Sequence, residues 1–398
     1  MSATAPSRDA SRALSLSTFA FTICFAVWTI FSIIGIQIRD QLSLTETQFG
    51  LLVGMPILSG SLVRLGLGVM TDRMGGRLVY TATMLTAAAA TFLLGWATTY
   101  AQMLVAALGV GMAGGSFAVG VAYVSRFFAA GRQGTALGIF GVGNVGAALT
   151  KFVAPFVMLA FGWQATAQIW AGVLAATAIL FWLFSTDDPV RDATPRGSFR
   201  DEFLPLRDMR VWRFAAYYFF SFGAFVALAL WLPHYLIGVY GFDVRMAGMV
   251  GAAYSIPASI FRAYGGVLSD RLGARRVMYA TFAVSLAATA ILSLPAQVPV
   301  WAFLATIFVL GFFMSLGKAA VFKHIPCYYP RNVGAVGGLV GMIGGLGGFL
   351  LPLLFGWLKD QTGLWSSCFV VLFVLVALCL AWMHLSIARM RSAQPEAA

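Results

Sequence analysis

The stretch SLVRLGLGVMTDRMGGR, residues 61–77, returns in the second half of the chain as SIFRAYGGVLSDRLGAR, residues 259–275. Over twenty aligned residues that begin with these stretches, nine positions are identical. Arg64 and Arg262 are one identical pair, and an Asp-Arg-x-Gly-x-Arg tag follows each of them. So many identities are not explained by coincidence, and they predict two halves that share one architecture.

The composition around the repeat is that of an integral membrane protein. Of the 398 residues, 60% are hydrophobic and only 10% are charged, more apolar surface than a water-soluble domain can bury. The apolar residues form long continuous runs, which predict helices rather than the short alternating strands of a membrane barrel. Each run can cross a bilayer, and the runs fall at about 17–38, 47–71, 78–97, 101–127, 134–158, 164–185, 212–237, 246–269, 276–296, 299–322, 333–357 and 364–387.

We therefore predict an all-α polytopic membrane protein with 12 transmembrane helices in two pseudo-symmetric six-helix bundles. A charged, proline-containing stretch without apolar periodicity interrupts the runs, and it is interpreted as a cytoplasmic linker. The predicted division is a cytoplasmic N-terminus (1–16), an N-terminal bundle (17–185), the linker (186–211), a C-terminal bundle (212–387) and a cytoplasmic C-terminus (388–398).

The formal net charge of +12 is explained by membrane topology rather than by a nucleic-acid partner. Nineteen of the 26 Lys and Arg residues fall in segments that the twelve-helix prediction puts on one side. Only Arg39, Arg245 and Lys359 fall on the other side. The positive-inside bias predicts that both termini lie in the cytoplasm.

The sequence offers no sign of an enzyme or of a bound cofactor. Its four cysteines form no Cys-x-x-Cys pair, so neither a disulfide framework nor a metal site is expected. There is no nucleophile–base set and no cofactor-binding loop. The apolar run that starts at Leu14 is interpreted as an uncleaved first helix. We expect a monomer that lies in the lipid bilayer and binds no nucleic acid.

Arg64 and Arg262 are the residues that point to a further partner, a small anion. Each lies eight residues before the Asp of its tag, about 12 Å along a helix, which is too deep for easy escape to the headgroups. A buried Arg costs about 2.5–3.5 kcal/mol on insertion scales, so it needs a partner or a cavity. All fourteen acids fall in loops or at predicted helix ends. The planar guanidinium groups of the two arginines are therefore expected to bind an oxyanion such as carboxylate or nitrate.

Two glycine-rich runs, GIFGVGNVGAA (138–148) and GAVGGLVGMIGGLGG (334–348), predict helices that pack closely and slide. Within the first run, Asn144 offers a mid-membrane amide that can donate to the anion. The two tags are predicted to gate the cycle by capping a helix end or by pairing with an arginine across the halves. The gating residues expected from these motifs are Asp72, Arg73, Asp270, Arg271, Gly141, Gly143, Gly344 and Gly345.

These motifs resemble those of the nitrate/nitrite porter family of the major facilitator superfamily. The resemblance spans the chain, and it includes Gly-x-Gly-Asn-x-Gly (141–146), GGSFAVGVAYVSRFF (114–128) and YYFFSFGAF (217–225). It implies that two arginines clamp a planar anion and that aromatic side chains sandwich it. Carried over by motif, the clamp is Arg64 with Arg262, and the sandwich includes Phe117, Tyr218 and Phe222.

The stretch SLGKAAVFKHIPCYYP (315–330) raises the question of what drives transport. Lys318 is predicted near mid-depth, where it either adds to the anion site or titrates. His324 lies nearer the cytoplasm, and Lys151 lies toward the outside; with Lys318 they are the candidates for coupling to protons. The short chain resembles the bacterial branch thought to favour nitrate/proton symport, so we expect symport for uptake. Nitrate/nitrite antiport, and exchange of another small anion such as formate or oxalate, stay open.

Overall fold

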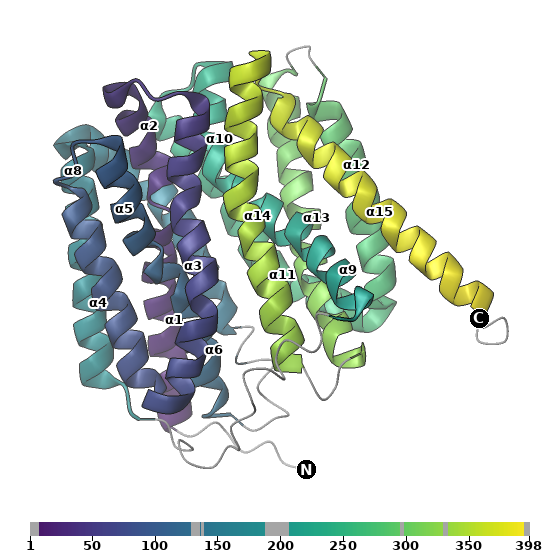
Figure 1. The fold of residues 1–398 in the computed structure, drawn as a ribbon, viewed down its shortest axis with the longest axis horizontal. Helices are drawn as coiled ribbons and strands as arrows, with labels where there is room; N and C mark the ends of the chain where they lie inside the picture. The colour runs from purple at the N-terminus through teal and green to yellow at the C-terminus, as the bar shows by residue number, and fades with distance from the viewer. Residues whose placement is uncertain are drawn as a thin grey trace. The chain divides into compact units, whose positions relative to one another are not determined.

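The computed structural model describes residues 8–128, 136, 139–187, 207–294, 298–328 and 333–393 (Figure 1). Every regular element in these ranges is a helix, as the apolar runs predict. The helices are α1 (Arg8–Trp28), α2 (Phe31–Leu42), α3 (Glu46–Met74), α4 (Gly76–Leu94), α5 (Tyr100–Val110), α6 (Met112–Ser125), η1 (Val142–Val145), α8 (Gly146–Phe184), α9 (Met209–Tyr218), η3 (Phe219–Ala224), α10 (Phe225–Tyr240), α11 (Val244–Leu272), α12 (Ala274–Leu292), α13 (Val300–Tyr328), α14 (Val333–Thr362) and α15 (Ser367–Ala393).

Within these described ranges, nine helical stretches are long and apolar enough to cross a membrane. One of them, Ile139–Phe184, contains a non-helical residue, Gly162 (φ 82°, ψ 167°), and is therefore two helices joined at a sharp bend. The long helices α3 and α11 are not among the nine. When the bend is counted and these two are added, the described segments agree with the predicted twelve.

The chain divides into two compact units. The first contains Met1–Arg196 together with Ala229–Ser259, and the second contains Gly197–Leu228 together with Ile260–Ala398. Both α10 and α11 therefore contribute one part to each unit. The division into 17–185 and 212–387 stays a prediction.

In the first unit, α1 and α4 both pack against α8, and α3 packs against α6 (Figure 1). Glycine makes the α1–α8 contact possible, because a Cβ added to Gly146 would lie 2.0 Å from the backbone oxygen of Thr22. The later part of α10 joins this unit through aromatic packing. The ring of Phe49 on α3 lies 5.7 Å from that of Trp231 and 4.5 Å from that of His234, between centroids.

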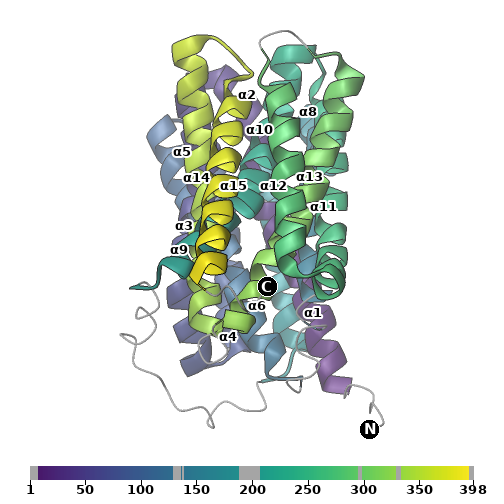
Figure 2. The same ribbon diagram turned by 90° about the vertical axis from the view of Figure 1, so that its right-hand side faces the viewer.

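In the second unit, α12 packs against α13 and α15, while α14 packs against α9 and η3 (Figure 2). The η3 segment is a single turn of π-helix, FFSFGA, between α9 and α10. Here too glycines set the spacing: a Cβ added to Gly223 would lie 2.6 Å from the backbone oxygen of Gly344. This close approach brings the end of α9 against the middle of α14.

The two tags of the repeat turn the chain in the same way. Gly75, between α3 and α4, has φ 90° and ψ 146°, and Gly273, between α11 and α12, has φ 85° and ψ 133°. Residues with a side chain rarely adopt a positive φ, so each turn needs glycine. The sequence repeat is thus also a repeat of backbone conformation.

Candidate functional site

Arg64 of α3 lies in an aromatic and backbone pocket of the first unit. Its Nε donates a hydrogen bond to the backbone oxygen of Gly114 on α6 (3.2 Å). Its Cζ lies 5.5 Å from the ring centroid of Trp28 on α1 and 5.6 Å from that of Phe117 on α6. Cation–π contact of this kind favours a guanidinium where water is scarce. The side chain is only half-buried, so its charge remains accessible.

Further aromatic rings hold the two rings beside Arg64. The Phe117 ring packs on Phe21 (5.5 Å) and on Phe140 (5.9 Å), and the Phe21 and Phe140 rings stack at 4.8 Å. The Trp28 indole donates to the backbone oxygen of Pro56 (2.7 Å). Both rings are therefore fixed independently of the arginine, and the wall is preorganised.

The Gly-x-Gly-Asn-x-Gly motif forms a 3-10 turn, η1, immediately before α8. A Cβ added to Gly143 would meet the Phe21 ring at 2.4 Å, whereas one added to Gly141 would meet nothing within 4 Å. Gly143 therefore allows α1 to approach, and Gly141 has space around it. Asn144 is half-buried on this turn.

Arg262 of α11 occupies the corresponding position in the second unit. Its Cζ lies 5.9 Å from the ring centroid of Phe322 on α13, and its side chain is half-buried. The ion pairs formed by the described residues do not include it. Because α3 and α6 correspond to α11 and α13, an arginine over a phenylalanine recurs at equivalent helices in both halves.

Tyr218 and Phe222 form an aromatic surface near the π-helical turn of the second unit. Their rings are parallel, with centroids 5.1 Å apart and an interplanar angle of 5°. Phe322, the partner of Arg262, meets the Tyr218 ring edge-on at 4.9 Å. A Cβ added to Gly344 would lie 2.3 Å from Tyr218, so this glycine gives the ring its place; the neighbouring Gly345 is also buried in α14.

Lys318 belongs to the same cluster. Its side chain is 2% exposed, and its Nζ lies 3.2 Å from the ring centroid of Phe225. It also lies close enough to Arg262 to interact with that charge. Lys318 and Arg262 thus interact electrostatically, and each contacts a phenylalanine of the second unit.

The other two coupling candidates lie elsewhere. Lys151 of α8 is fully buried in the first unit, and its Nζ donates to Ser255 Oγ on α11 (3.1 Å) and approaches the backbone oxygen of Ala147 (3.5 Å). His324 stacks on Phe214 in the second unit, with ring centroids 5.6 Å apart. Of the three candidates, Lys318 is the one close enough to Arg262 to interact with its charge.

The side chains of the predicted gating residues are described only in part. Arg271 is exposed at the end of α11. The side chains of Asp72, Arg73 and Asp270 lie outside the described residues. What is described of the tag is its turn, through the backbone angles of Gly273 and its counterpart in the first half.

Three features of these sites were missed by the sequence reasoning: Phe322, Trp28 and a polar network on the first unit. In that network Arg39 Nη1 contacts Glu46 Oε1 (3.0 Å), and His234 Nε2 contacts Glu46 Oε2 (2.6 Å). Long-range contacts make all three. In the sequence, this network was indicated only by Arg39, one of the few cations predicted on the non-cytoplasmic side of the membrane.

Comparison with known proteins agrees with the fold and the motifs. Residues 16–249 and 240–397 match the Major Facilitator Superfamily. The chain is 42% identical to the probable nitrate/nitrite antiporter NarK1 of Thermus thermophilus, over 96% of this chain and 93% of the relative. It is 29% identical to the nitrite extrusion protein of Bacillus subtilis, over 90% of each.

Among solved structures, a bacterial homologue of the human lysosomal transporter Spinster, inward-facing and occupied, matches with a TM-score of 0.77. The match covers 97% of this chain and 98% of the other, at 16% sequence identity, and so it supports the fold alone. The paired arginines, the glycine motif and the relatives all indicate the same protein family. The chain is a multi-pass membrane protein of the Major Facilitator Superfamily and belongs to its nitrate/nitrite porter family.

Proposed function

We propose that this protein exchanges nitrate for nitrite across a bacterial cytoplasmic membrane by alternating access, with both termini in the cytoplasm. The observation that carries the proposal is the repeated arginine–aromatic pair, Arg64 with Phe117 and Arg262 with Phe322. The 42% identical relative, a probable nitrate/nitrite antiporter, supports the same substrates and favours exchange over the symport that the sequence predicted.

The chemistry of the two pairs suits a planar oxyanion. A guanidinium offers parallel N–H donors that match two oxygens of nitrate or nitrite, and delocalised anions are weakly hydrated. Aromatic walls offer nothing to replace the water shell of a strongly hydrated anion. Arg64 and Arg262 are proposed to bind the anion during the cycle, with Asn144 as a further donor and with Phe117, Tyr218 and Phe222 as walls.

Exchange also follows from the energetics of the buried cations. Moving one anion inward against an inside-negative potential costs about 2.3 kcal/mol per 100 mV, whereas a one-for-one exchange moves no net charge. An empty carrier would have to reorient with the charge of Arg262 uncompensated by an anion. A bound anion removes this penalty, so reorientation requires cargo in both directions.

Nitrate/proton symport is the second candidate, and Lys318 is the observation that favours it. This lysine is almost completely buried and close enough to Arg262 to interact with its charge, so it could deliver a proton without a carboxylate. His324 and Lys151 remain alternatives for the same role.

Counterflow in proteoliposomes with an internal pH dye separates the two candidates. We expect nitrate entry to require internal nitrite or nitrate and to leave internal pH unchanged. Lys318→Gln should then slow exchange by weakening the anion site, again without a pH change. Nitrate entry into anion-free vesicles with internal acidification, reduced in the Lys318→Gln variant, would establish symport instead.

Phe222→Ala tests the aromatic wall. Removing one of two stacked rings opens space for water beside the anion, so discrimination against hydrated anions should fall. We expect the preference for nitrate over chloride to drop by about tenfold, which corresponds to about 1.4 kcal/mol. Competition by chloride in nitrate exchange measures this, with Phe156→Ala, an exposed phenylalanine of α8, as the control. An unchanged preference would remove Phe222 from the site.

Competition with formate and oxalate tests the remaining alternative. If the forks select a flat nitrogen oxyanion, nitrite should compete with labelled nitrate far better than either carboxylate. Equal competition by oxalate would assign the protein to carboxylate exchange, and the arginine pairs would keep their role with another cargo.

A further inference from the structure

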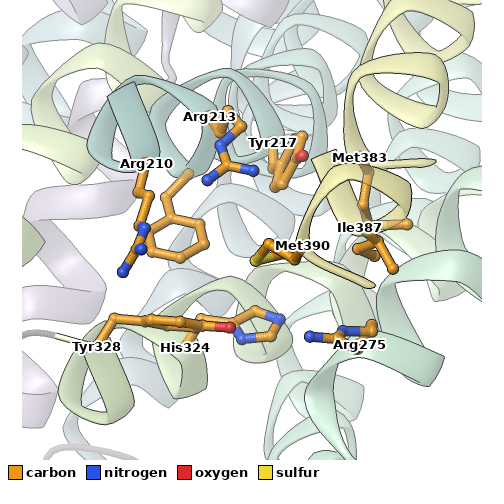
Figure 3. Close-up of a pocket in the computed structure, with 10 residues that line it drawn as sticks. Arg210, Arg213, Tyr217, Arg275, His324, Tyr328, Met383, Ile387 and Met390 are labelled. Atoms are coloured by element: carbon orange, nitrogen blue, oxygen red, sulfur yellow. The ribbon is translucent and has the colours of Figure 1, made fainter. Parts of the chain in front are cut away.

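A second basic site lies in the second unit (Figure 3). It is a pocket of about 40 Å³, where α9 and α12 begin and α13 ends. His324 lines this pocket, six residues or about 9 Å along α13 from Lys318. The lining residues are Arg210, Arg213, Phe214, Tyr217, Arg275, His324, Tyr328, Met383, Ile387 and Met390.

We propose that this pocket binds the phosphate of an anionic phospholipid. Three guanidiniums line it, Arg210 and Arg213 from α9 and Arg275 from α12, and none of the described residues that line it is a carboxylate. Figure 3 shows these groups around one space, with Arg275 on the opposite side from the α9 arginines. Guanidinium clusters of this kind bind phosphate oxygens by several charge-assisted hydrogen bonds.

The arginines have donors left for a ligand. The Nε of Arg213 is buried and has no hydrogen-bond partner among the described residues, which is costly unless a ligand satisfies it. The guanidinium of Arg210 lies 5.6 Å from the Tyr328 ring centroid. Asp208, at the start of α9, accepts from the backbone N–H of Arg210 and does not line the pocket.

The opposite wall of the pocket is suited to a lipid rather than to a free ion. Met383, Ile387 and Met390 follow one another at helical spacing on α15 and present apolar side chains. His324 lies flat against Phe214, and Tyr328 is exposed at the mouth. The arginines can bind an anionic headgroup, and the neighbouring apolar side chains of α15 can contact the start of its acyl chains.

One helix, α13, connects this pocket with the proposed anion site. α13 carries His324 and Tyr328 into this pocket, and the same helix carries Lys318 and Phe322 into the cluster around Arg262. A lipid that holds the end of α13 therefore acts on the helix that positions the proposed anion site. The binding claim itself does not depend on what the protein transports.

Thermal unfolding of the purified protein in neutral detergent tests the proposal. The probes are short-chain phosphatidylglycerol, the matching phosphatidylcholine and inorganic phosphate. Phosphatidylglycerol should raise the melting temperature saturably, and the Arg213→Gln/Arg275→Gln double variant should bind it at least tenfold more weakly. Arg276→Gln removes the neighbouring exposed charge, which does not line the pocket, and should bind as the parent does.

Each other outcome overturns the assignment. Equal stabilisation by inorganic phosphate would make the pocket a free-phosphate site, and equal stabilisation by phosphatidylcholine would show that charge is irrelevant. Equal loss in the Arg276→Gln variant would mean that general surface charge, not the pocket, attracts the lipid. If the double variant does not fold, Arg275→Gln alone, at an exposed position, carries the same test, and unchanged phosphatidylglycerol binding in it would refute the site.

Discussion

Arg262→Lys is expected to weaken nitrate binding by about 100-fold and to stop exchange at ordinary substrate concentrations. A lysine keeps the charge but loses the planar pair of donors, and a hydrogen bond to a charged group contributes about 1.5–3 kcal/mol. It also loses the contact of the guanidinium with Phe322, which holds the fork in place. Arg64→Lys should behave alike, because Arg64 also contacts a phenylalanine on the equivalent helix.

Nitrate binding to the purified variants and counterflow in vesicles both measure this effect. The matched control is Arg245→Lys, the same exchange at an exposed arginine whose Cζ lies 5.4 Å from the Phe156 ring. It should leave nitrate binding unchanged while removing a similar cation–π contact. Near-normal nitrate affinity in the Arg262→Lys or Arg64→Lys protein would refute a role for the two guanidinium groups in binding. Loss in all three would show that the effect does not depend on whether the arginine lies in the proposed anion site.

The sequence was informative about the fold because membrane helices obey simple rules. Hydrocarbon thickness sets the length of a span, and satisfied backbone hydrogen bonds require a helix, so apolar runs locate the helices. The repeat located Arg64 and Arg262 at equivalent positions, and it located Gly75 and Gly273 at the turns that need positive φ. These properties are local, so they can be recognised from the amino-acid sequence alone.

The parts that sequence could not give depend on contacts between distant segments. Phe322 meets Arg262 only because α13 packs beside α11, and no spacing rule identifies it among 34 phenylalanines. The π-helical turn in FFSFGA changes which side chains share a face, and it lies where Gly223 closely approaches α14. His324 was placed near the cytoplasm, but its partners in the basic pocket come from three other helices.

Gly146→Ala is expected to have the second large effect, this time on stability. A Cβ at this position would lie 2.0 Å from the backbone oxygen of Thr22 and 2.8 Å from the backbone nitrogen of Ala26, both on α1. Main-chain atoms cannot turn aside as a flexible side chain can, so α1 and α8 would have to separate. Membrane helices gain stability from such close packing, and overpacking costs about 1–3 kcal/mol.

The melting temperature in detergent and the fraction of monodisperse protein measure this cost. Gly172→Ala is the matched control, since Gly172 is also on α8 but is exposed, and a Cβ added there would meet no atom within 4 Å. There the added methyl should be neutral or gain a few tenths of a kcal/mol through reduced backbone freedom. A Gly146→Ala protein as stable as Gly172→Ala would mean that α1 can shift without penalty. The glycine-rich run would then serve movement of α1 over α8 rather than their fixed contact.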